Sequence, residues 1–330
     1  MEGTCFLCKE NKELTVEHII PQAIGGFLKE PIYCSGCNNK SGEDIDSTVT
    51  SAFARYASLM NVKRERGENQ PFVVNDKESG LELEFRNNSF NRKTTIVEKE
   101  TNSEGVLISA QIYARSTAEL NKIKTGFSKK YNIPKCNFRL EQSEIPPPIG
   151  EVDLILTGND LYRAIAKIAY GFACIKIPKE RILSSHFDGI REYIKGERDS
   201  KFVSLNYEST SFMSDNNRPL NKICITYNRL EGIVIGYVAI FGAFRYTILL
   251  GEQLTSNIEW ATIDHTADPI RRREIPTPNY FIPPRISKNE VLYPNQTEQS
   301  VIQALNDGLK LIRNHSDALS DIFVNITSRT

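Results

Sequence analysis

The chain has 330 residues, a formal net charge of zero and a charged-residue content of 25%. This length allows one large domain or two ordinary ones, and the composition is typical of a folded, soluble protein. Zero net charge argues against a protein that coats DNA over its whole surface, but it permits an enzyme with a local basic groove. The start, MEGTCFLCKE, lacks the basic and apolar regions of a signal peptide, so we expect a cytoplasmic protein without membrane contact.

The first half of the chain predicts a small helical segment followed by strands. A helix is expected around DIDSTVTSAFARYASLM, and short alternating segments over 72–113 predict an antiparallel sheet. Helical spacing returns at STAELNKIKTGFSKKY, and IPPPIG at 145–150 interrupts the chain. The next predicted helix is NDLYRAIAKIAYGFACIKI, with Asn159 or Asp160 as its N-cap.

The second half predicts a helix around FDGIREYIKG, a closing helix at EQSVIQALNDGLKLIRN, and strands near 202–208, 222–228, 232–240 and 244–250. The stretch 232–250 is apolar enough to suggest a membrane helix, but it contains Arg245 and breaks at Phe241-Gly242-Ala243. We therefore predict two buried strands and a tight turn there. The expected fold class is α+β, with a small domain at 1–64 and a larger α+β domain at 65–330. A break near 145–150 is the candidate for a further boundary.

Four of the seven cysteines lie in the first 40 residues, as Cys5-x-x-Cys8 and Cys34-x-x-Cys37. This spacing lets both thiolates of a pair reach one ion, and two pairs complete a tetrahedral Zn²⁺ site. A segment of about 60 residues has only a small hydrophobic core, so a bound metal ion that stabilises its fold is also expected on physical grounds. Because four cysteines leave no coordination position open, this zinc is predicted to be structural. The other cysteines, in apolar surroundings, are predicted core residues: Cys136, Cys174 and Cys224.

The segment between and after the cysteine pairs resembles the HNH nuclease family, which has the ββα-metal fold. The residues that carry the resemblance, within roughly 4–46, are the four cysteines, Glu17-His18, Ile20-Pro21, Gly25-Gly26 and Asn38. The resemblance implies that Glu17 and Asn38 ligate a catalytic divalent ion, that His18 is the general base, and that Asn38 stands where a helix begins. Many family members also carry an Asn on the second hairpin strand that orients the base. Here that strand, FLKEPIYC, has none, and Asn39 or a backbone carbonyl is the candidate for this role.

The residue types agree with this chemistry. Carboxylate and amide oxygens are hard ligands that suit Mg²⁺ or Mn²⁺, and a neutral histidine can deprotonate water beside the ion. The alternatives are a structural histidine for His18, a solvated carboxylate for Glu17 and a helix cap for Asn38. The remaining histidines, at positions without a partner at metal or triad spacing, are predicted to be surface or structural residues: His186, His265 and His315.

Two basic clusters lie beyond the first 64 residues. One is Arg271-Arg272-Arg273, and the other comprises Lys122, Lys124, Lys129, Lys130, Lys135 and Arg139. Either cluster suits a phosphate backbone, and a solvated surface explains each equally well. The leading hypothesis is a metal-dependent endonuclease that hydrolyses double-stranded DNA, expected in bacterial restriction or defence against foreign DNA. The alternative is a non-catalytic zinc module that binds nucleic acid or a partner protein. The larger domain leaves room for a homo-oligomer contact or for a small-molecule or protein activator.

Overall fold

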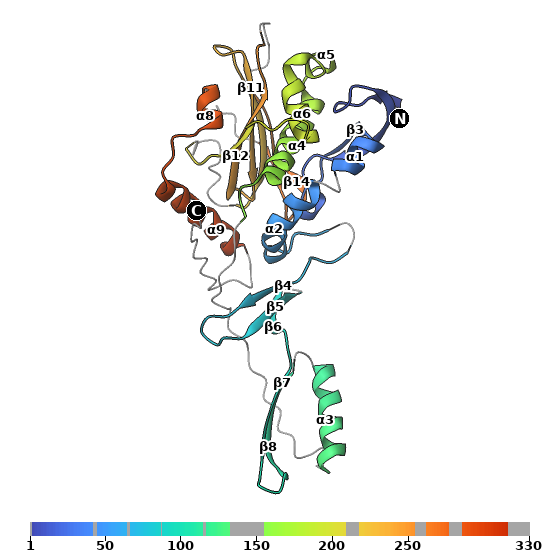
Figure 1. The fold of residues 1–330 in the computed structure, drawn as a ribbon, viewed down its shortest axis with the longest axis vertical. Helices are drawn as coiled ribbons and strands as arrows, with labels where there is room; N and C mark the ends of the chain where they lie inside the picture. Colours follow the sequence, from blue (N-terminus) through green and yellow to red (C-terminus); the bar gives the residue numbers. More distant parts are fainter. Residues whose placement is uncertain are drawn as a thin grey trace. The chain divides into compact units, whose positions relative to one another are not determined.

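The computed structural model describes residues 2–41, 45–64, 67–86, 88–114, 117–132, 155–208, 218–254, 262–276 and 286–315. These residues form helices and antiparallel strands, which confirms the predicted α+β class (Figure 1). They divide into two compact units, the first built from the described residues within 1–70 and 155–315 and the second from the described residues within 71–132. The N-terminal segment thus shares a unit with the described residues of 155–315. The domain boundary expected between residues 64 and 65 stays a prediction.

The first unit begins with a ββα arrangement. Strands β1 (Glu2–Thr4), β2 (Asn11–His18) and β3 (Lys29–Cys34) form an antiparallel sheet in that order. Helix α1 (Ser35–Ser41) follows β3 directly, and the predicted second helix is present as α2 (Ser47–Leu59). The expectation that this helix begins at Asn38 is wrong, because α1 begins at Ser35. The turn that brings Cys37 next to Cys34 is therefore the first turn of the helix.

A six-stranded antiparallel sheet forms the core of the first unit, in the order β14-β13-β10-β11-β12-β9. The strands are β9 (Val203–Leu205), β10 (Asn221–Asn228), β11 (Ile233–Ile240), β12 (Phe244–Gly251), β13 (Thr262–Asp268) and β14 (Arg273–Glu274). Strands β11 and β12 are buried along their whole length, and positive φ angles at Phe241 and Gly242 form the turn between them. This confirms the two buried strands predicted over 232–250. Within the described part of the chain, none of the helices has the length and apolar character needed to cross a membrane.

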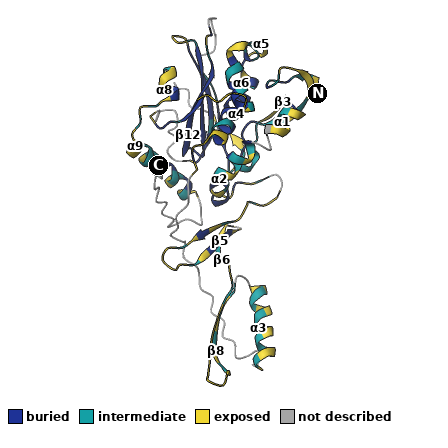
Figure 2. Ribbon diagram, in the orientation of Figure 1, coloured by how far each residue is buried: buried dark blue, intermediate teal, exposed yellow. Residues whose placement is uncertain are grey.

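Helices cover this sheet. The helices are α4 (Asn159–Lys176), α5 (Lys179–Ile182), α6 (Asp188–Lys195), α8 (Lys288–Leu292) and α9 (Glu298–Asn314), with short 3₁₀ turns at η1 (Gln22–Ile24) and η4 (Ser185–Phe187). The central helix α4 packs against β9, β10, β11 and β12, and most of its residues are buried (Figure 2). The predicted N-cap at Asn159 or Asp160 is wrong. Helix α4 starts after Gly158, whose φ of 128° suits glycine, and Asp160 pairs with Arg163 instead.

The second unit contains the strands predicted over 72–113, but in two separate sheets. Strands β4 (Phe72–Asn75), β5 (Glu82–Arg86) and β6 (Ser89–Arg92) form one sheet, and β7 (Ile96–Thr101) pairs with β8 (Leu107–Tyr113) in the other. Ring contacts among Phe72, Phe85 and Phe90 give the first sheet a small core. The predicted helix is present as α3 (Thr117–Tyr131), and none of its residues is fully buried.

Candidate active site and zinc centre

The four N-terminal cysteines come together as predicted. Their sulfur atoms all lie within 4.8 Å of one another, and the Sγ atoms of Cys8 and Cys34 are 3.9 Å apart. Tetrahedral zinc, with Zn–S bonds of about 2.3 Å, requires sulfur atoms roughly 3.8 Å apart, so the cluster fits the ion. The Cys34 amide donates to the Cys5 Sγ atom over 3.3 Å, which is the type of bond that stabilises a metal-bound thiolate.

The thiol groups already differ in acidity within this cluster. A hydrogen bond with Cys37 is the main cause that lowers the pKa of Cys5 to about 4, whereas the same contact raises the pKa of Cys37. Burial raises the pKa of Cys8. One thiolate is therefore favoured even without an ion, and a bound Zn²⁺ would complete deprotonation of the others.

The hairpin between the cysteine pairs is held by its two glycines. Gly25 has a φ of 87°, and a Cβ atom added there would lie 2.3 Å from the Cβ atom of Pro269. A Cβ atom on Gly26 would lie 1.8 Å from the carbonyl oxygen of Ile20. The side chain of Asn221 on β10 donates to the Ile24 carbonyl oxygen over 2.8 Å. The hairpin loop is therefore packed directly against the six-stranded sheet and the turn after β13.

Glu17 lies near the end of β2, where its carboxylate is buried against helix α4. Its Oε1 atom is 2.6 Å from the Nζ atom of Lys167, and that Nζ atom is also 2.5 Å from the Oδ2 atom of Asp46. Burial raises the pKa of Glu17, and the nearby Lys167 opposes that increase. The alternative of a solvated carboxylate for Glu17 is therefore wrong, because only 12% of its side chain is exposed.

Asn38 in α1 faces β2. Its side-chain amide donates to the Thr15 hydroxyl over 3.0 Å and to the Val16 carbonyl oxygen over 3.4 Å. The nearby Asn38 side chain also opposes the increase in the pKa of Glu17 that burial causes. The predicted ligands Glu17 and Asn38 thus lie beside the same end of β2. The donor chemistry of this pair, a carboxylate and an amide, fits a hard divalent ion.

His18 is the last residue of β2, next to Glu17, and is opposite Lys29 on β3. Its Nε2 atom is buried, and it shares strand β2 with the candidate ligand Glu17. Asn39 is exposed on α1. Its predicted role in orienting His18 stays a prediction.

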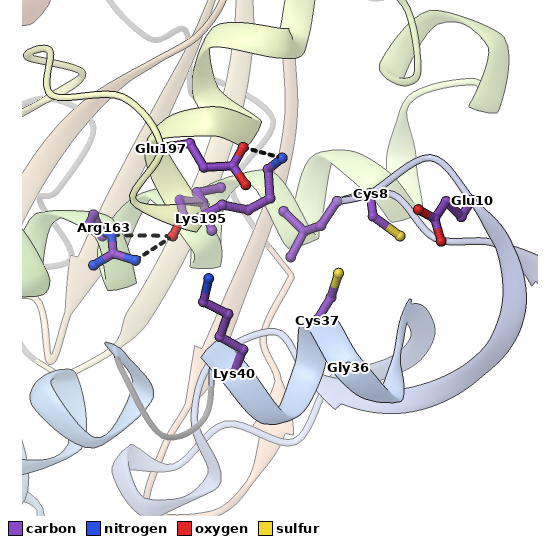
Figure 3. Close-up of a pocket in the computed structure, with 10 residues that line it drawn as sticks. Cys8, Glu10, Gly36, Cys37, Lys40, Arg163, Lys195 and Glu197 are labelled. Carbon is purple, nitrogen blue, oxygen red and sulfur yellow. Dashed lines mark hydrogen bonds and ion pairs between the residues drawn. The ribbon is translucent and has the colours of Figure 1, made fainter.

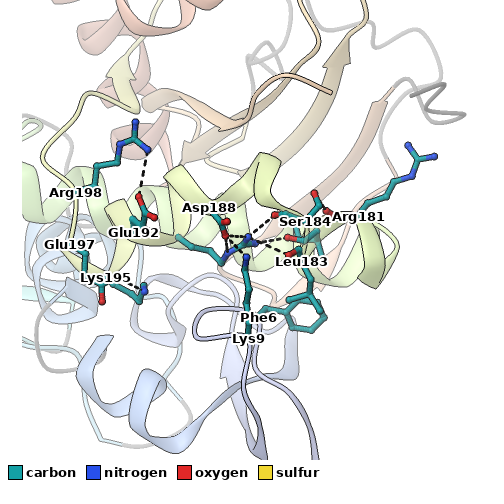
Figure 4. A network of polar contacts seen from close by, with 12 residues as sticks. Phe6, Lys9, Arg181, Leu183, Ser184, Asp188, Glu192, Lys195, Glu197 and Arg198 are labelled. Carbon is teal, nitrogen blue, oxygen red and sulfur yellow. Dashed lines mark hydrogen bonds and ion pairs between the residues drawn. The ribbon is translucent and has the colours of Figure 1, made fainter. Parts of the chain in front are cut away.

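A polar network connects Lys9, next to the first cysteine pair, with α6 and the turn before it (Figure 4). The guanidinium group of Arg191, 2% exposed, donates to the carbonyl oxygens of Ile182 and Ser184, both over 2.6 Å, and forms an ion pair with Asp188. Asp188 also pairs with Lys9, which follows Cys8. The segment that carries the first cysteine pair is therefore linked to α6 by the ion pair between Lys9 and Asp188.

A pocket of about 390 Å³ lies beside the zinc cluster (Figure 3). Gly36, Cys37 and Lys40 of α1 line one side of it, and Arg163 and Lys195 line the other. The Lys40 side chain extends into this pocket toward Arg163. Asn38 points instead to β2, so the pocket is on a different face of α1 from the candidate metal ligands.

The arginine cluster lies close to the hairpin loop, since Arg271 and Arg272 form the turn between β13 and β14 and Pro269 in this turn meets Gly25. The lysines 122, 124, 129 and 130 lie on α3 in the second unit, while Lys135, Cys136 and Arg139 are outside the described residues. Cys174 and Cys224 are buried, as predicted.

The other three histidines stay outside the candidate site. His265 is buried and contacts Glu274, with 3.1 Å between its Nδ1 atom and the carboxylate. His186 is exposed, with its ring close to the Glu252 carbonyl oxygen, and His315 is exposed at the end of α9. These positions agree with the predicted surface and structural roles.

Lys167 and Asp46 were missed by sequence reasoning. The available signal was a single lysine in the apolar run AIAKIAYGF. Its partners Glu17 and Asp46 lie more than 100 positions away, so the sequence pattern gives no indication of them.

Comparison with known families agrees with this geometry. Residues 5–54 match a family model described as HNH endonuclease. No curated protein and no solved structure matches the chain. The N-terminal ββα segment, with its four-cysteine cluster, is therefore similar to HNH endonucleases over residues 5–54.

Proposed function

We propose that this protein is a metal-dependent DNA endonuclease and that residues 5–54 hydrolyse the phosphodiester bond. The observation that carries the proposal is the placement of Asn38 of α1 against the end of β2 that carries Glu17 and His18, in a segment where four cysteines cluster. Glu17 and Asn38 would hold Mg²⁺ or Mn²⁺, which stabilises negative charge on the scissile phosphate and the leaving oxygen.

In this proposal His18 is the general base. An imidazole nitrogen takes a proton from the attacking water, whose oxygen forms the new bond to phosphorus while the bond to the leaving oxygen breaks. Zinc does no chemistry, because four thiolates fill its coordination shell. Its role is to hold β3 and α1 so that Asn38 faces Glu17.

Two basic features near the hairpin support a nucleic-acid substrate. Lys40, Arg163 and Lys195 line the pocket beside the cysteine cluster together with Glu10 and Glu197, and the β13–β14 turn presents Arg271 next to the hairpin loop. The basic groups among these suit phosphate oxygens of a double-stranded DNA backbone.

The test is cleavage of supercoiled plasmid by zinc-loaded protein with Mg²⁺ or Mn²⁺, against a control with EDTA. We expect His18→Ala to keep the fold and the zinc but to lose about 10²–10⁴-fold in rate. His186→Ala, a change at an exposed histidine outside the site, is the matched control and should cleave at the wild-type rate. Equal rates for His18→Ala and wild type would contradict the assignment of the base.

A non-catalytic zinc module that binds nucleic acid or a partner protein is the second candidate. The ion pair between Glu17 and Lys167 favours it, because this contact occupies the carboxylate that the metal would use. DNA binding without cleavage by the wild-type protein, at any concentration of Mg²⁺ or Mn²⁺, would support this alternative.

The proposal extends to restriction of foreign DNA or defence against it. Plating of phage on cells that express the wild-type protein or His18→Ala tests this extension. Equal phage titres on both strains would contradict the defence role while leaving the enzymatic proposal to the plasmid assay.

A further inference from the structure

Lys167 is a charged residue in the most apolar part of helix α4. Its neighbours Ala166 and Ile168 are buried, and only 3% of its own side chain is exposed. Burial of an ammonium group is costly unless it is paired, and a buried ion pair rarely stabilises a fold more than apolar residues of the same volume. Packing alone therefore does not explain a lysine at this position.

The ammonium group of Lys167 lies between two carboxylates of the HNH segment. Its Nζ atom is 2.6 Å from Glu17 on β2 and 2.5 Å from Asp46, and the ring of Tyr33 is 6.0 Å away. Helix α4 thus places one positive charge, the Lys167 ammonium group, between the carboxylates of Glu17 and Asp46.

Asp46 lies directly before α2, and its backbone is already helical, with φ of −68° and ψ of −30°. Its side chain makes no hydrogen bond to the first turn of α2, and the carboxylate is directed to Lys167. The Lys167 ammonium group therefore lies within ion-pair distance of a second carboxylate besides that of Glu17.

We propose that Lys167 is a positioning residue of the active site: its ammonium group neutralises Glu17 and Asp46, and the divalent ion must compete with it. This inference rests on the proposed function, in which Glu17 and Asn38 hold the ion. Two carboxylates and one ammonium group carry a net charge of −1, and a divalent ion in place of the ammonium group gives zero. The ion and the ammonium group together give +1, so each disfavours the other.

This competition sets a threshold for metal. At low Mg²⁺ or Mn²⁺ the lysine keeps Glu17 and Asp46 in place without the ion, and the site is folded but inactive. At higher concentrations the ion binds to Glu17 and Asn38, and the ammonium group moves away from Glu17. The protein therefore needs more metal than a site with the same ligands and no lysine.

The test measures Mn²⁺ binding from the loss of the electron paramagnetic resonance signal of free Mn²⁺, on the full zinc-loaded chain. Lys167→Met should bind Mn²⁺ at least tenfold more tightly than wild type, and its thermal stability should depend on Mn²⁺. Lys167→Arg keeps the charge and should bind as weakly as wild type. Lys176→Met, at the exposed end of the same helix, is the matched control and should leave binding unchanged. Binding by Lys167→Met that equals or falls below wild type would overturn the proposal.

If Lys167→Met does not fold even with Mn²⁺, Asp46→Asn carries the test. Loss of this carboxylate should weaken Mn²⁺ binding at least tenfold, and unchanged binding would overturn the inference.

The experiments distinguish failure of the competition between Lys167 and the ion from failure of the proposed nuclease function. Wild-type protein that cleaves DNA, with no tighter binding by Lys167→Met, overturns the competition alone. Tighter binding by Lys167→Met, with no cleavage by wild type, supports the competition and overturns the nuclease.

Discussion

The hydroxyl group of Tyr170 donates a hydrogen bond to the carbonyl oxygen of Phe6 over 2.8 Å. Phe6 lies between the first two cysteines and Tyr170 lies in the buried centre of α4, so this bond joins the cysteine cluster to the helix that covers the sheet. Arg191 donates to the same hydroxyl over 3.0 Å. Because the cysteine cluster packs on this network, its stability and that of the first unit should be coupled.

Arg191→Met tests the network. The change removes a buried guanidinium group and leaves Asp188 and the carbonyl oxygens of Ile182 and Ser184 with fewer donors. Asp188 is more than a third exposed and keeps Lys9, so the cost comes from the carbonyl oxygens that lose a donor. A buried acceptor left unsatisfied costs about 1–3 kcal/mol, and we expect a decrease of that size in the free energy of unfolding. Urea unfolding followed by circular dichroism measures it. Arg198→Met, in an exposed pair with Glu192, is the control and should cost no more than about 1 kcal/mol.

Cys34→Ser should remove the zinc. Structural zinc contributes roughly 10–16 kcal/mol of apparent binding free energy, which the fold of the HNH segment then lacks. Since α4 contacts this segment through Lys167 and Tyr170, we expect the unfolding midpoint of the whole first unit to fall. A colorimetric zinc assay and thermal unfolding measure the two effects. Cys174→Ala, in a buried cysteine outside the cluster, should keep one zinc per chain; a Cys34→Ser protein with full zinc would contradict the site.

Much of the candidate site was predictable because its residues are close in the sequence. Cysteine spacing predicted the metal cluster, and the EH pair with the GG turn predicted the hairpin that carries Glu17 and His18. Apolar runs likewise predicted α4 and the paired strands β11 and β12. These signals are local, since a few neighbouring residues determine them.

Contacts between distant segments were not predictable. Lys167 meets Asp46 across 121 positions, and Gly25 meets Pro269 across an even longer separation. Strand β13, with the sequence TIDHTAD, was not predicted, because polar residues occur on both of its faces and neither face is apolar. In the structure it pairs with β10, and its second half is buried. Sequence periodicity shows which side of an element is buried, but it does not identify the partner that covers it.

Gly25→Ala should destabilise the hairpin loop. The φ of 87° costs an L-residue about 1–2 kcal/mol, and the added Cβ atom would lie 2.6 Å from the Cα atom of Pro269, which cannot move without the turn after β13. We expect a total loss above about 2 kcal/mol in the free energy of urea unfolding. Gly36→Ala is the matched control, because its added Cβ atom meets nothing within 4 Å and lies in α1. That control should be neutral or more stable, since alanine favours a helix. Equal midpoints for both variants would contradict this account of the loop.

Asn38→Ala should separate metal binding from proton transfer. Loss of the amide removes one proposed ligand, so cleavage of plasmid should fall at low Mg²⁺ or Mn²⁺ and recover in part at high metal. His18→Ala should show no recovery at any metal concentration, because an ion does not replace a base. The measurement is the cleavage rate as a function of Mn²⁺ concentration for the two variants. The same metal dependence in both would contradict the assignment of separate roles.

Charge reversal of Arg271, Arg272 and Arg273 should weaken DNA binding. These residues lie on and beside the turn that meets the hairpin loop, and each phosphate contact adds about −0.9 to the slope of log affinity against log salt concentration. Loss of three contacts should therefore flatten the slope by as much as about 3. Fluorescence anisotropy with a labelled duplex at several salt concentrations measures affinity and slope together. Reversal of Lys122, Lys129 and Lys130 on α3 is the matched comparison in the second unit. If only the α3 variant changes the slope, DNA binds through the second unit, and the arginine turn is a solvated surface.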